Sequence, residues 1–321
     1  MIPAPSMLSL VQDYLHERRR FGFALTIVGA QLLNFARFAD RAGHYGPLTV
    51  QLMMGWARGE AKRASPANWA RRLAILRPFA KYRAQIEPGT EIPCTDVFGD
   101  KRRRPTPHIY TVAEIADLLA AARRLPPAGT LRPLTYETFF GLIAATGLRL
   151  SEARCLRCGD FDVSGGTLAI RQTKFCKSRL VPLHPTTIAA LAQYLSARQR
   201  FAPAVPEAPL FVSPSNTTLA KSTVQCVFAR LRAELGWIGR GTLPVPRIHD
   251  LRHSFVCRRV MLWHETGADI DNTMLALSTY VGHAKVSDTY WYLTAVPDLM
   301  AVAAKHFELF AAADTGEAQN A

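Results

Sequence analysis

Three short segments in the second half of the chain contain side chains that could cut a phosphodiester bond without a metal. They are Thr146–Glu152 (TGLRLSE), His249–His253 (HDLRH) and Gly282–Tyr292 (GHAKVSDTYWY). Two guanidiniums can bind phosphate oxygens, imidazoles can donate and accept protons, and a phenol can attack phosphorus. The candidate catalytic residues in these segments are Arg149, His249, Arg252, His283 and Tyr292, with Tyr292 as the nucleophile.

Arg149 lies in a short turn that should hold it rigidly. Gly147 is predicted to end one helix, and Ser151 is predicted to cap the next. Glu152 is expected to support the arginine, because a buried guanidinium needs a carboxylate or backbone partner. A rigid, supported guanidinium suits phosphate binding.

His249 and Arg252 are three residues apart, shortly after Pro246. On a helix that begins there, both side chains lie on one face, so one phosphate could meet a proton donor and a guanidinium together. His253 lies about 100° round the helix from Arg252 and is expected to be structural. Asp250 is expected to cap the helix or orient a neighbour, because carboxylates are favoured in a first turn.

Tyr292 follows His283 by nine residues, which on one unbroken helix would place the two on opposite faces. Ser287–Asp288 are good helix caps, so a new helix is predicted to begin there and to bring Tyr292 back towards His283. Tyr280 and Tyr290 are the alternative nucleophiles.

Two lysines lie in a predicted β-turn between the segments Thr167–Gln172 and Arg179–Leu183, which together read as an antiparallel hairpin. A lysine on such a turn could enter a groove and protonate a leaving oxygen. From the residues alone, a turn that merely faces solvent is an equal alternative. The two candidates are Lys174 and Lys177.

The order of the predicted elements gives a mainly α-helical fold with a small antiparallel β-sheet (α+β). Residues 1–88 are predicted to form a helical domain of about four helices, with the last starting at Ser65-Pro66. Residues 89–107 are predicted to form a proline-containing basic linker. Residues 108–303 are predicted to form a second domain, whose first helix opens with a Thr111–Glu114 capping box. Residues 304–321 are predicted to form a C-terminal docking helix and a flexible tail. The linker holds the basic run Lys101, Arg102, Arg103 and Arg104, which we expect to contact phosphate.

The charge of the chain favours a polyanionic partner. Its 321 residues include 39 Lys and Arg against 25 Asp and Glu, a net charge of +14, and each phosphate that such a protein neutralises releases counterions. No long apolar stretch or signal-peptide pattern is apparent, so a cytoplasmic location is expected. Cys155 and Cys158 have no second pair to complete a zinc site, and no metal or cofactor is expected.

The motifs resemble, in order and spacing, those of the tyrosine recombinases, the phage integrase family. That family has an arginine in Thr-Gly-x-Arg-x-Ser-Glu, a lysine on a β-turn, His-x-x-Arg, Gly-His, and a tyrosine nine residues after that histidine. The resemblance is strong over residues 108–300, whereas the front 90 residues match only in kind, as a SAM-like core-binding domain. Val281 stands where leucine is commoner. The matching positions are Arg149, Lys174, His249, Arg252, His283 and Tyr292.

The resemblance implies a tyrosine-recombinase catalytic domain that cleaves DNA through a 3′-phosphotyrosine, with no metal, ATP or other cofactor. Lys174, with His249, would handle the leaving-group proton, while the arginines and His283 would stabilise the phosphorane. The implied partner is double-stranded DNA, which Lys177 and the linker would also contact. Further copies of the chain would form a tetramer on two DNA sites. Other recombinases or accessory proteins are also implied as partners. A membrane partner is not expected, and the location would be the nucleoid.

Two other functions compete with a recombinase for integration or excision of a mobile element. One is a non-catalytic DNA-binding regulator or accessory factor, which the basic front domain would serve equally well. The other is a topoisomerase that nicks single strands. The complete set of six reactive positions argues against a binder, and a separate basic helical domain with a docking helix at 304–321 favours recombination. The DNA target cannot be read from the sequence.

Overall fold

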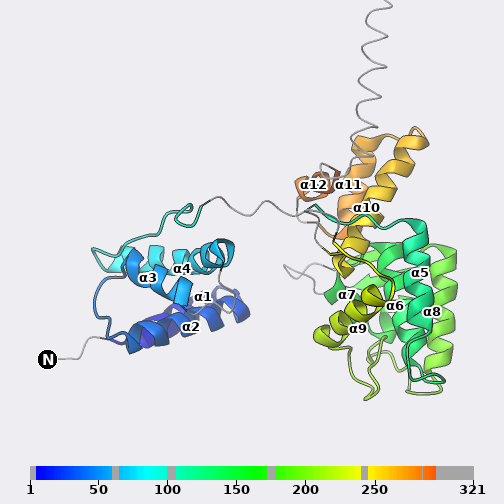
Figure 1. Cartoon of the computed structure of the whole chain (residues 1–321), viewed down its shortest axis with the longest axis horizontal. Helices are drawn as coiled ribbons and strands as arrows, with labels where there is room; N and C mark the ends of the chain where they lie inside the picture. Colours follow the sequence, from blue (N-terminus) through cyan, green and yellow to red (C-terminus); the bar gives the residue numbers. More distant parts are fainter. Residues whose placement is uncertain are drawn as a thin grey trace, which may run out of the picture. The chain divides into compact units, whose positions relative to one another are not determined.

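The computed structural model describes residues 5–59, 65–99, 106–171, 178–239, 245–283 and 285–293, without the side chains of 270, 271 and 291–293. The chain divides into two compact units, Met1–Arg104 and Pro105–Ala321 (Figure 1). Among the described helices, none has the length and apolar character needed to span a bilayer.

The described residues of the first unit form helices α1 (Met7–Arg20), α2 (Thr26–Arg41), α3 (Val50–Gly59) and α4 (Pro66–Ile86). Local chemistry sets their starts, since Ser65 caps α4 with Pro66 in its first turn, as predicted. Asp40, near the end of α2, accepts hydrogen bonds from the first two backbone N–H groups of α1. Trp56 is fully buried at the centre of the unit, and the Arg72 guanidinium lies 3.9 Å from its ring centroid.

The second unit is built around α6 (Arg132–Thr146), which packs against α5 (Val112–Arg123), α8 (Pro185–Arg198) and α10 (Ile248–Glu265) (Figure 1). Its core is apolar and aromatic, with Phe139 and Phe140 of α6 against Phe211 and Phe228. The capping box predicted at the start of α5 is present, because Thr111 and Glu114 bond each other's backbone N–H groups. The packing makes α6 and α10 a rigid pair whose ends meet at the candidate site.

A small sheet lies beside these helices. Strands β1 (Phe161–Asp162), β2 (Thr167–Ile170) and β3 (Arg179–Pro182) pair antiparallel in that order, with Leu168 opposite Val181. The hairpin of β2 and β3 was predicted, whereas β1, at two residues, is too short to show a periodic pattern. The mainly helical fold with a small antiparallel sheet is confirmed.

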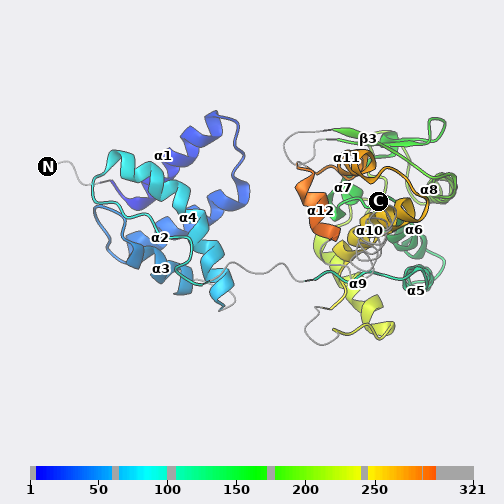
Figure 2. The same ribbon diagram turned by 90° about the horizontal axis from the view of Figure 1, so that it is seen from above.

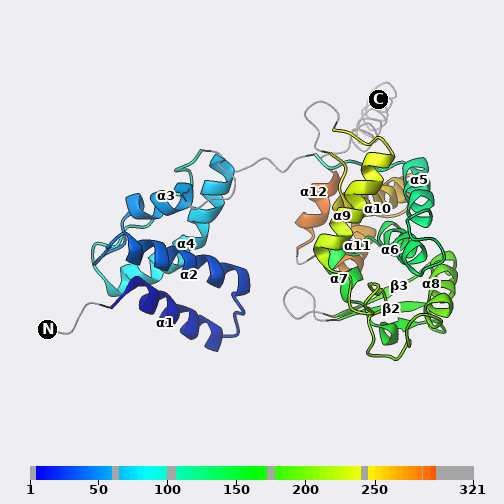
Figure 3. The same cartoon turned by 60° about the horizontal axis from the view of Figure 1, so that its bottom comes forward.

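The remaining elements are α7 (Leu150–Cys155), a short 3-10 helix at Cys158–Asp160, α9 (Lys221–Glu234), α11 (Ile270–Val281) and α12 (Ser287–Leu293). Figure 2 shows β3 next to α11, a contact that joins the sheet to the C-terminal helices. Figure 3 brings α9 to the front, beside α7 and α10. The helix predicted to begin at Ser287–Asp288 is α12, and the one predicted after Pro246 is α10.

Candidate active site

The turn between α6 and α7 places Arg149 at the site. Gly147 ends α6 with φ +64°, and a Cβ there would lie 2.6 Å from a ring carbon of Phe255, so only glycine fits between the two helices. The prediction that Ser151 caps α7 is wrong. The helix begins at Leu150, two residues before the start that a Ser151 cap implies, and the Glu152 carboxylate accepts the backbone N–H of Arg149 at 2.9 Å.

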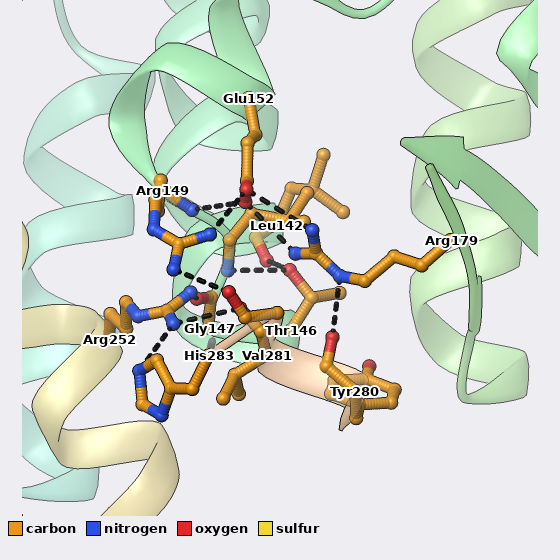
Figure 4. A network of polar contacts seen from close by, with 12 residues as sticks. Leu142, Thr146, Gly147, Arg149, Glu152, Arg179, Arg252, Tyr280, Val281 and His283 are labelled. Carbon is orange, nitrogen blue, oxygen red and sulfur yellow. Dashed lines mark hydrogen bonds and ion pairs between the residues drawn. The ribbon is translucent and has the colours of Figure 1, made fainter. Parts of the chain in front are cut away.

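Glu152 lies between two arginines, as Figure 4 shows. Its Oε1 accepts from Arg149 Nη1 at 2.7 Å and from Arg179 Nη1 at 3.1 Å, and its Oε2 accepts from Arg179 Nη2 at 3.0 Å. Burial by itself would raise the pKa of the Glu152 carboxyl, but the hydrogen bonds and charge of Arg179, with those of Arg149, lower that pKa below its ordinary value. Glu152 is therefore a buried carboxylate that fixes both guanidiniums.

Arg252 joins three segments of the chain. Its guanidinium donates to the Gly147 carbonyl at 2.7 Å and to the Val281 carbonyl at 2.8 Å, and Nη2 lies 2.8 Å from His283 Nε2 (Figure 4). Arg149 reaches the same corner, since its Nη2 donates to the Gly282 carbonyl at 2.6 Å. Arg252 is only 1% exposed, whereas the side chain of Arg149 is 31% exposed.

The contacts of His283 determine which ring nitrogen bears its proton. An arginine N–H can only donate, so Nε2, next to Arg252, must be the acceptor. Nδ1 then bears the hydrogen and donates to the hydroxyl of Thr289, 2.7 Å away and fully buried in α12. Burial, with the charges of Arg252 and Arg149, lowers the pKa of His283 to about 4, so the ring is neutral at pH 7.

His249 and His253 occupy different environments on α10. His253 is buried, which agrees with a structural role, and its ring meets that of His249 edge to face at 4.8 Å. His249 is exposed and lines a pocket together with Arg149. Although part of the ring faces the open pocket, desolvation by the protein packed around it, with the charge of Arg252, lowers the pKa of His249. Asp250 is the predicted cap, because it accepts the backbone N–H of Arg247 at 2.8 Å.

Several predicted residues fall where the structure is not described. The backbone of Tyr292 lies in α12, and its side chain lies outside the described part. Of the alternative nucleophiles, Tyr280 donates its hydroxyl to the Pro182 carbonyl and stacks on Phe255, whereas Tyr290 is 44% exposed. Outside the described residues lie Lys174, Lys177, Lys101, Arg102, Arg103, Arg104 and the segment 304–321.

Sequence reasoning missed two polar residues of this cluster, Arg179 and Thr289. Arg179 was used only to mark the start of a strand, although its guanidinium also donates to the Tyr280 carbonyl at 2.7 Å. Its position directly after the predicted lysine turn was a signal that could have identified it. Thr289 lies just inside the predicted start of α12, and only the folded structure shows that it faces His283.

Gly282 provides a direct test of how tightly this cluster is packed. It has φ +72°, and a Cβ there would lie 2.6 Å from Arg179 Nη1. Gly267 also has positive φ, +67°, but has open space around its Cα. Gly282→Ala is expected to lower the free energy of unfolding by about 2 kcal/mol more than Gly267→Ala, because Arg179 must leave its partners. Urea denaturation measures both variants, and equal losses would contradict the packing described.

Neutralising Glu152 is expected to destabilise the unit strongly. Glu152→Gln removes the buried carboxylate that neutralises Arg149 and Arg179, which should cost about 3 kcal/mol of folding free energy. The matched control is Glu234→Gln, which breaks the exposed Arg124–Glu234 pair and should cost less than about 1 kcal/mol. Thermal and urea unfolding give the comparison, and a Glu152→Gln loss as small as the control's would show that Glu152 does not hold the arginines.

The buried histidines make stability depend on pH. Burial, with the charge of His249, lowers the pKa of His253 to about 3, and the pKa of His283 is about 4, against an ordinary 6.5. Below pH 6.5 these two histidines bind protons in the unfolded chain but not in the folded chain. The stabilisation that comes from keeping them neutral is therefore complete above pH 6.5, and it is lost as the pH falls towards 4 for His283 and towards 3 for His253. Each histidine contributes about 1.4 kcal/mol per pH unit in that range. Urea midpoints at pH 7 and pH 5 test this, since unchanged stability would contradict it. His253→Leu should reduce the slope.

The chain is similar in sequence to known integrases and recombinases. Residues 109–297 match the model of the phage integrase family. The integrase/recombinase y4rB of Sinorhizobium fredii (strain NBRC 101917 / NGR234) is 39% identical over 302 residues, covering 93% of this chain and 96% of that protein. Tyrosine recombinase XerD of Caulobacter vibrioides is 30% identical over 280 residues, covering 86% and 87%.

Solved structures show the same fold. The Tn1549 transposon integrase in complex with transposon right end DNA superimposes with a TM-score of 0.67 at 17% identity, over 94% of this chain and 99% of that one. The XerH site-specific recombinase bound to palindromic difH substrate gives 0.61 at 18% identity, over 88% and 79%. The chain belongs to the phage integrase family of tyrosine recombinases, which catalyse DNA cleavage and rejoining.

Proposed function

We propose that this chain is a site-specific recombinase that integrates or excises a mobile DNA element through a 3′-phosphotyrosine intermediate. The observation that carries the proposal is the hydrogen-bonded cluster in which Arg149, Arg252 and His283, from three separate sequence motifs, meet within one network. A protein that only binds DNA has no need for two arginines fixed around a neutral histidine next to a helix that contains Tyr292.

In the first step, the Tyr292 phenol oxygen attacks the scissile phosphorus and the bond from phosphorus to the 5′ oxygen breaks. The products are a 3′-phosphotyrosine and a free 5′-hydroxyl. Desolvation and the charge of Arg252 lower the pKa of His249, which favours the neutral ring. A neutral imidazole can accept the phenol proton, while Lys174 protonates the leaving oxygen. Arg149, whose side chain is 31% exposed, contacts the phosphate, and the buried charge of Arg252 stabilises the extra negative charge of the phosphorane.

In the second step, the 5′-hydroxyl of another strand attacks the same phosphorus and releases Tyr292. The phosphotyrosine conserves the energy of the broken bond, so the reaction needs neither metal nor ATP. Since recombination exchanges strands between two duplexes, the working assembly is a tetramer on two DNA sites. The relatives named integrase and the fold shared with a transposon integrase support a mobile-element role.

Strand exchange between two duplexes tests the function as a whole. The substrates are labelled duplexes that span the two ends of the DNA segment in which the gene for this chain lies, incubated with protein in EDTA without ATP. Hybrid duplexes are expected with the wild type and not with Arg149→Ala. Binding without joining would instead indicate the non-catalytic regulator, and relaxation of any supercoiled plasmid without hybrid products would indicate a topoisomerase.

A further inference from the structure

A basic pocket of about 530 Å³ adjoins the catalytic cluster on the side of Arg149 and His249. It is formed by α7, α9 and the start of α10, which Figure 3 shows next to one another. Among its described lining residues there is no Asp or Glu. Its basic residues are Arg149, Arg154, Lys221, Arg232, Arg247 and His249.

Two of the arginines are fixed by neutral partners. Arg154 Nε donates to the Leu219 carbonyl at 2.5 Å, and Arg232 Nη1 donates to the Pro246 carbonyl at 3.2 Å. A guanidinium has five N–H donors, so one backbone contact orients it and leaves others to bind a ligand. Within the described part of the chain, neither arginine forms an ion pair. Among the described residues, no carboxylate therefore lies within ion-pair distance of either guanidinium.

The other two arginines of the pocket do have carboxylate partners. Arg149 pairs with Glu152 at 2.7 Å, and Arg247 pairs with Asp250 at 2.7 Å. The charge without a carboxylate partner among the described residues is thus concentrated on the α7–α9 side of the pocket, at Arg154, Lys221 and Arg232. Three cations in an open pocket, with fixed guanidinium donors, are suited to an anion with several oxygens.

We infer that this pocket binds the DNA phosphate next to the scissile one on the same strand. Arg149 and His249 line the pocket and also belong to the proposed catalytic site, so a ligand here adjoins the reacting phosphate. Successive phosphates of one strand are about 3.4 Å apart along the helix axis, which makes the neighbouring phosphate the anion that DNA itself delivers. The inference rests on the proposed function and adds a phosphate subsite to it.

The subsite has a mechanistic consequence. Holding the neighbouring phosphate fixes the position of the sugar between the two phosphates, and therefore the direction of the bond that must break. Positioning of this kind lowers the barrier to a displacement, because the leaving oxygen must lie opposite the attacking one. Arg154, Lys221 and Arg232 are then positioning residues that act through the DNA backbone.

Charge removal on both sides of the contact tests the subsite. Methylphosphonate duplexes replace one charged phosphate oxygen with a methyl group, at one position at a time across the cleavage site. Wild-type protein is expected to bind and cleave about tenfold less well when a neighbour of the scissile phosphate is modified. The Arg154→Gln/Arg232→Gln variant should lose about tenfold on unmodified DNA and show no further loss on that one modified duplex.

Two further variants make the result independent of folding. Lys221→Gln removes an exposed charge of the pocket and should show the same coupling, even if the double variant folds poorly. Arg230→Gln removes an exposed charge on α9 that does not line the pocket, and it should remain as sensitive to the modification as the wild type. DNA affinity is also measured as a function of salt concentration. The slope of log K against log salt should be about one unit shallower for Lys221→Gln than for the wild type.

The outcomes separate the subsite from the proposed function. If the loss caused by each pocket variant simply multiplies the loss caused by the methylphosphonate, at every modified position, the pocket does not contact that phosphate. This result would overturn the subsite even though wild-type protein cleaves DNA. Competition by free inorganic phosphate that weakens DNA binding of the wild type but not of Lys221→Gln, with no coupling to any DNA position, would do the same and would indicate a small-anion site. A wild type that forms no covalent DNA complex would overturn the proposed function, while binding measurements on the same duplexes would still report the coupling.

Discussion

Tyr292→Phe is expected to abolish covalent attachment to DNA, a loss of about 10⁴-fold or more, while DNA affinity stays within about twofold. Phenylalanine keeps the aromatic ring but has no oxygen to attack phosphorus. The measurement uses a nicked duplex in which cleavage releases a short fragment and traps the complex, with EDTA present and a denaturing gel as readout.

The control for this prediction is Tyr290→Phe. Tyr290 is on the same helix and is 44% exposed, so its replacement removes an exposed phenol two residues away from Tyr292. The structure supports Tyr292 through its helix, since α12 packs on α10 and α11 and contains Thr289, the partner of His283. A covalent band that persists in Tyr292→Phe and disappears in Tyr290→Phe would assign the nucleophile to Tyr290.

Arg252→Lys is expected to lower the cleavage rate by about 10³-fold with little change in DNA affinity. A lysine is a point charge without the planar fork, so it cannot bond the Gly147 and Val281 carbonyls and orient His283 at once. The lost contacts should also reduce stability by about 1–3 kcal/mol, and rates must therefore be measured well below the melting temperature.

Arg259→Lys is the matched control for that substitution. Arg259 lies on the same helix and is exposed. Its guanidinium carbon lies 5.6 Å from the centroid of the Phe255 ring. Its replacement should leave the single-turnover cleavage rate within about twofold. If Arg252→Lys cleaves as fast as Arg259→Lys, the guanidinium geometry of Arg252 has no part in catalysis.

Local chemistry in the sequence predicted much of the framework. Ser65-Pro66, the Thr111–Glu114 capping box and Gly147 each set a helix boundary through contacts within a few residues, and such contacts can be inferred without the fold. The i, i+3 spacing of His249 and Arg252 followed in the same way from helix geometry. The error at Ser151 came from a competition between neighbours, because the Glu152 carboxylate bonds the N–H at the start of α7.

Contacts between distant residues could not be predicted. Arg179 and Glu152 are 27 residues apart, and their pairing depends on where β3 lies beside α11 and α7. The near-complete burial of Arg252 depends on α10 packing against α6. Basic residues of α7 and α9 line a common pocket only because of how distant helices pack, and nothing in the charge pattern of the sequence distinguishes Arg232 from Arg230.

The most direct test of the mechanism is to identify the bond between protein and DNA. Covalent complex trapped with wild-type protein is digested with protease and nuclease, and mass spectrometry locates the nucleotide on the peptide. We predict a nucleotide joined through its 3′-phosphate to Tyr292. A nucleotide joined through its 5′-phosphate, or attached to any residue other than Tyr292, would contradict the mechanism.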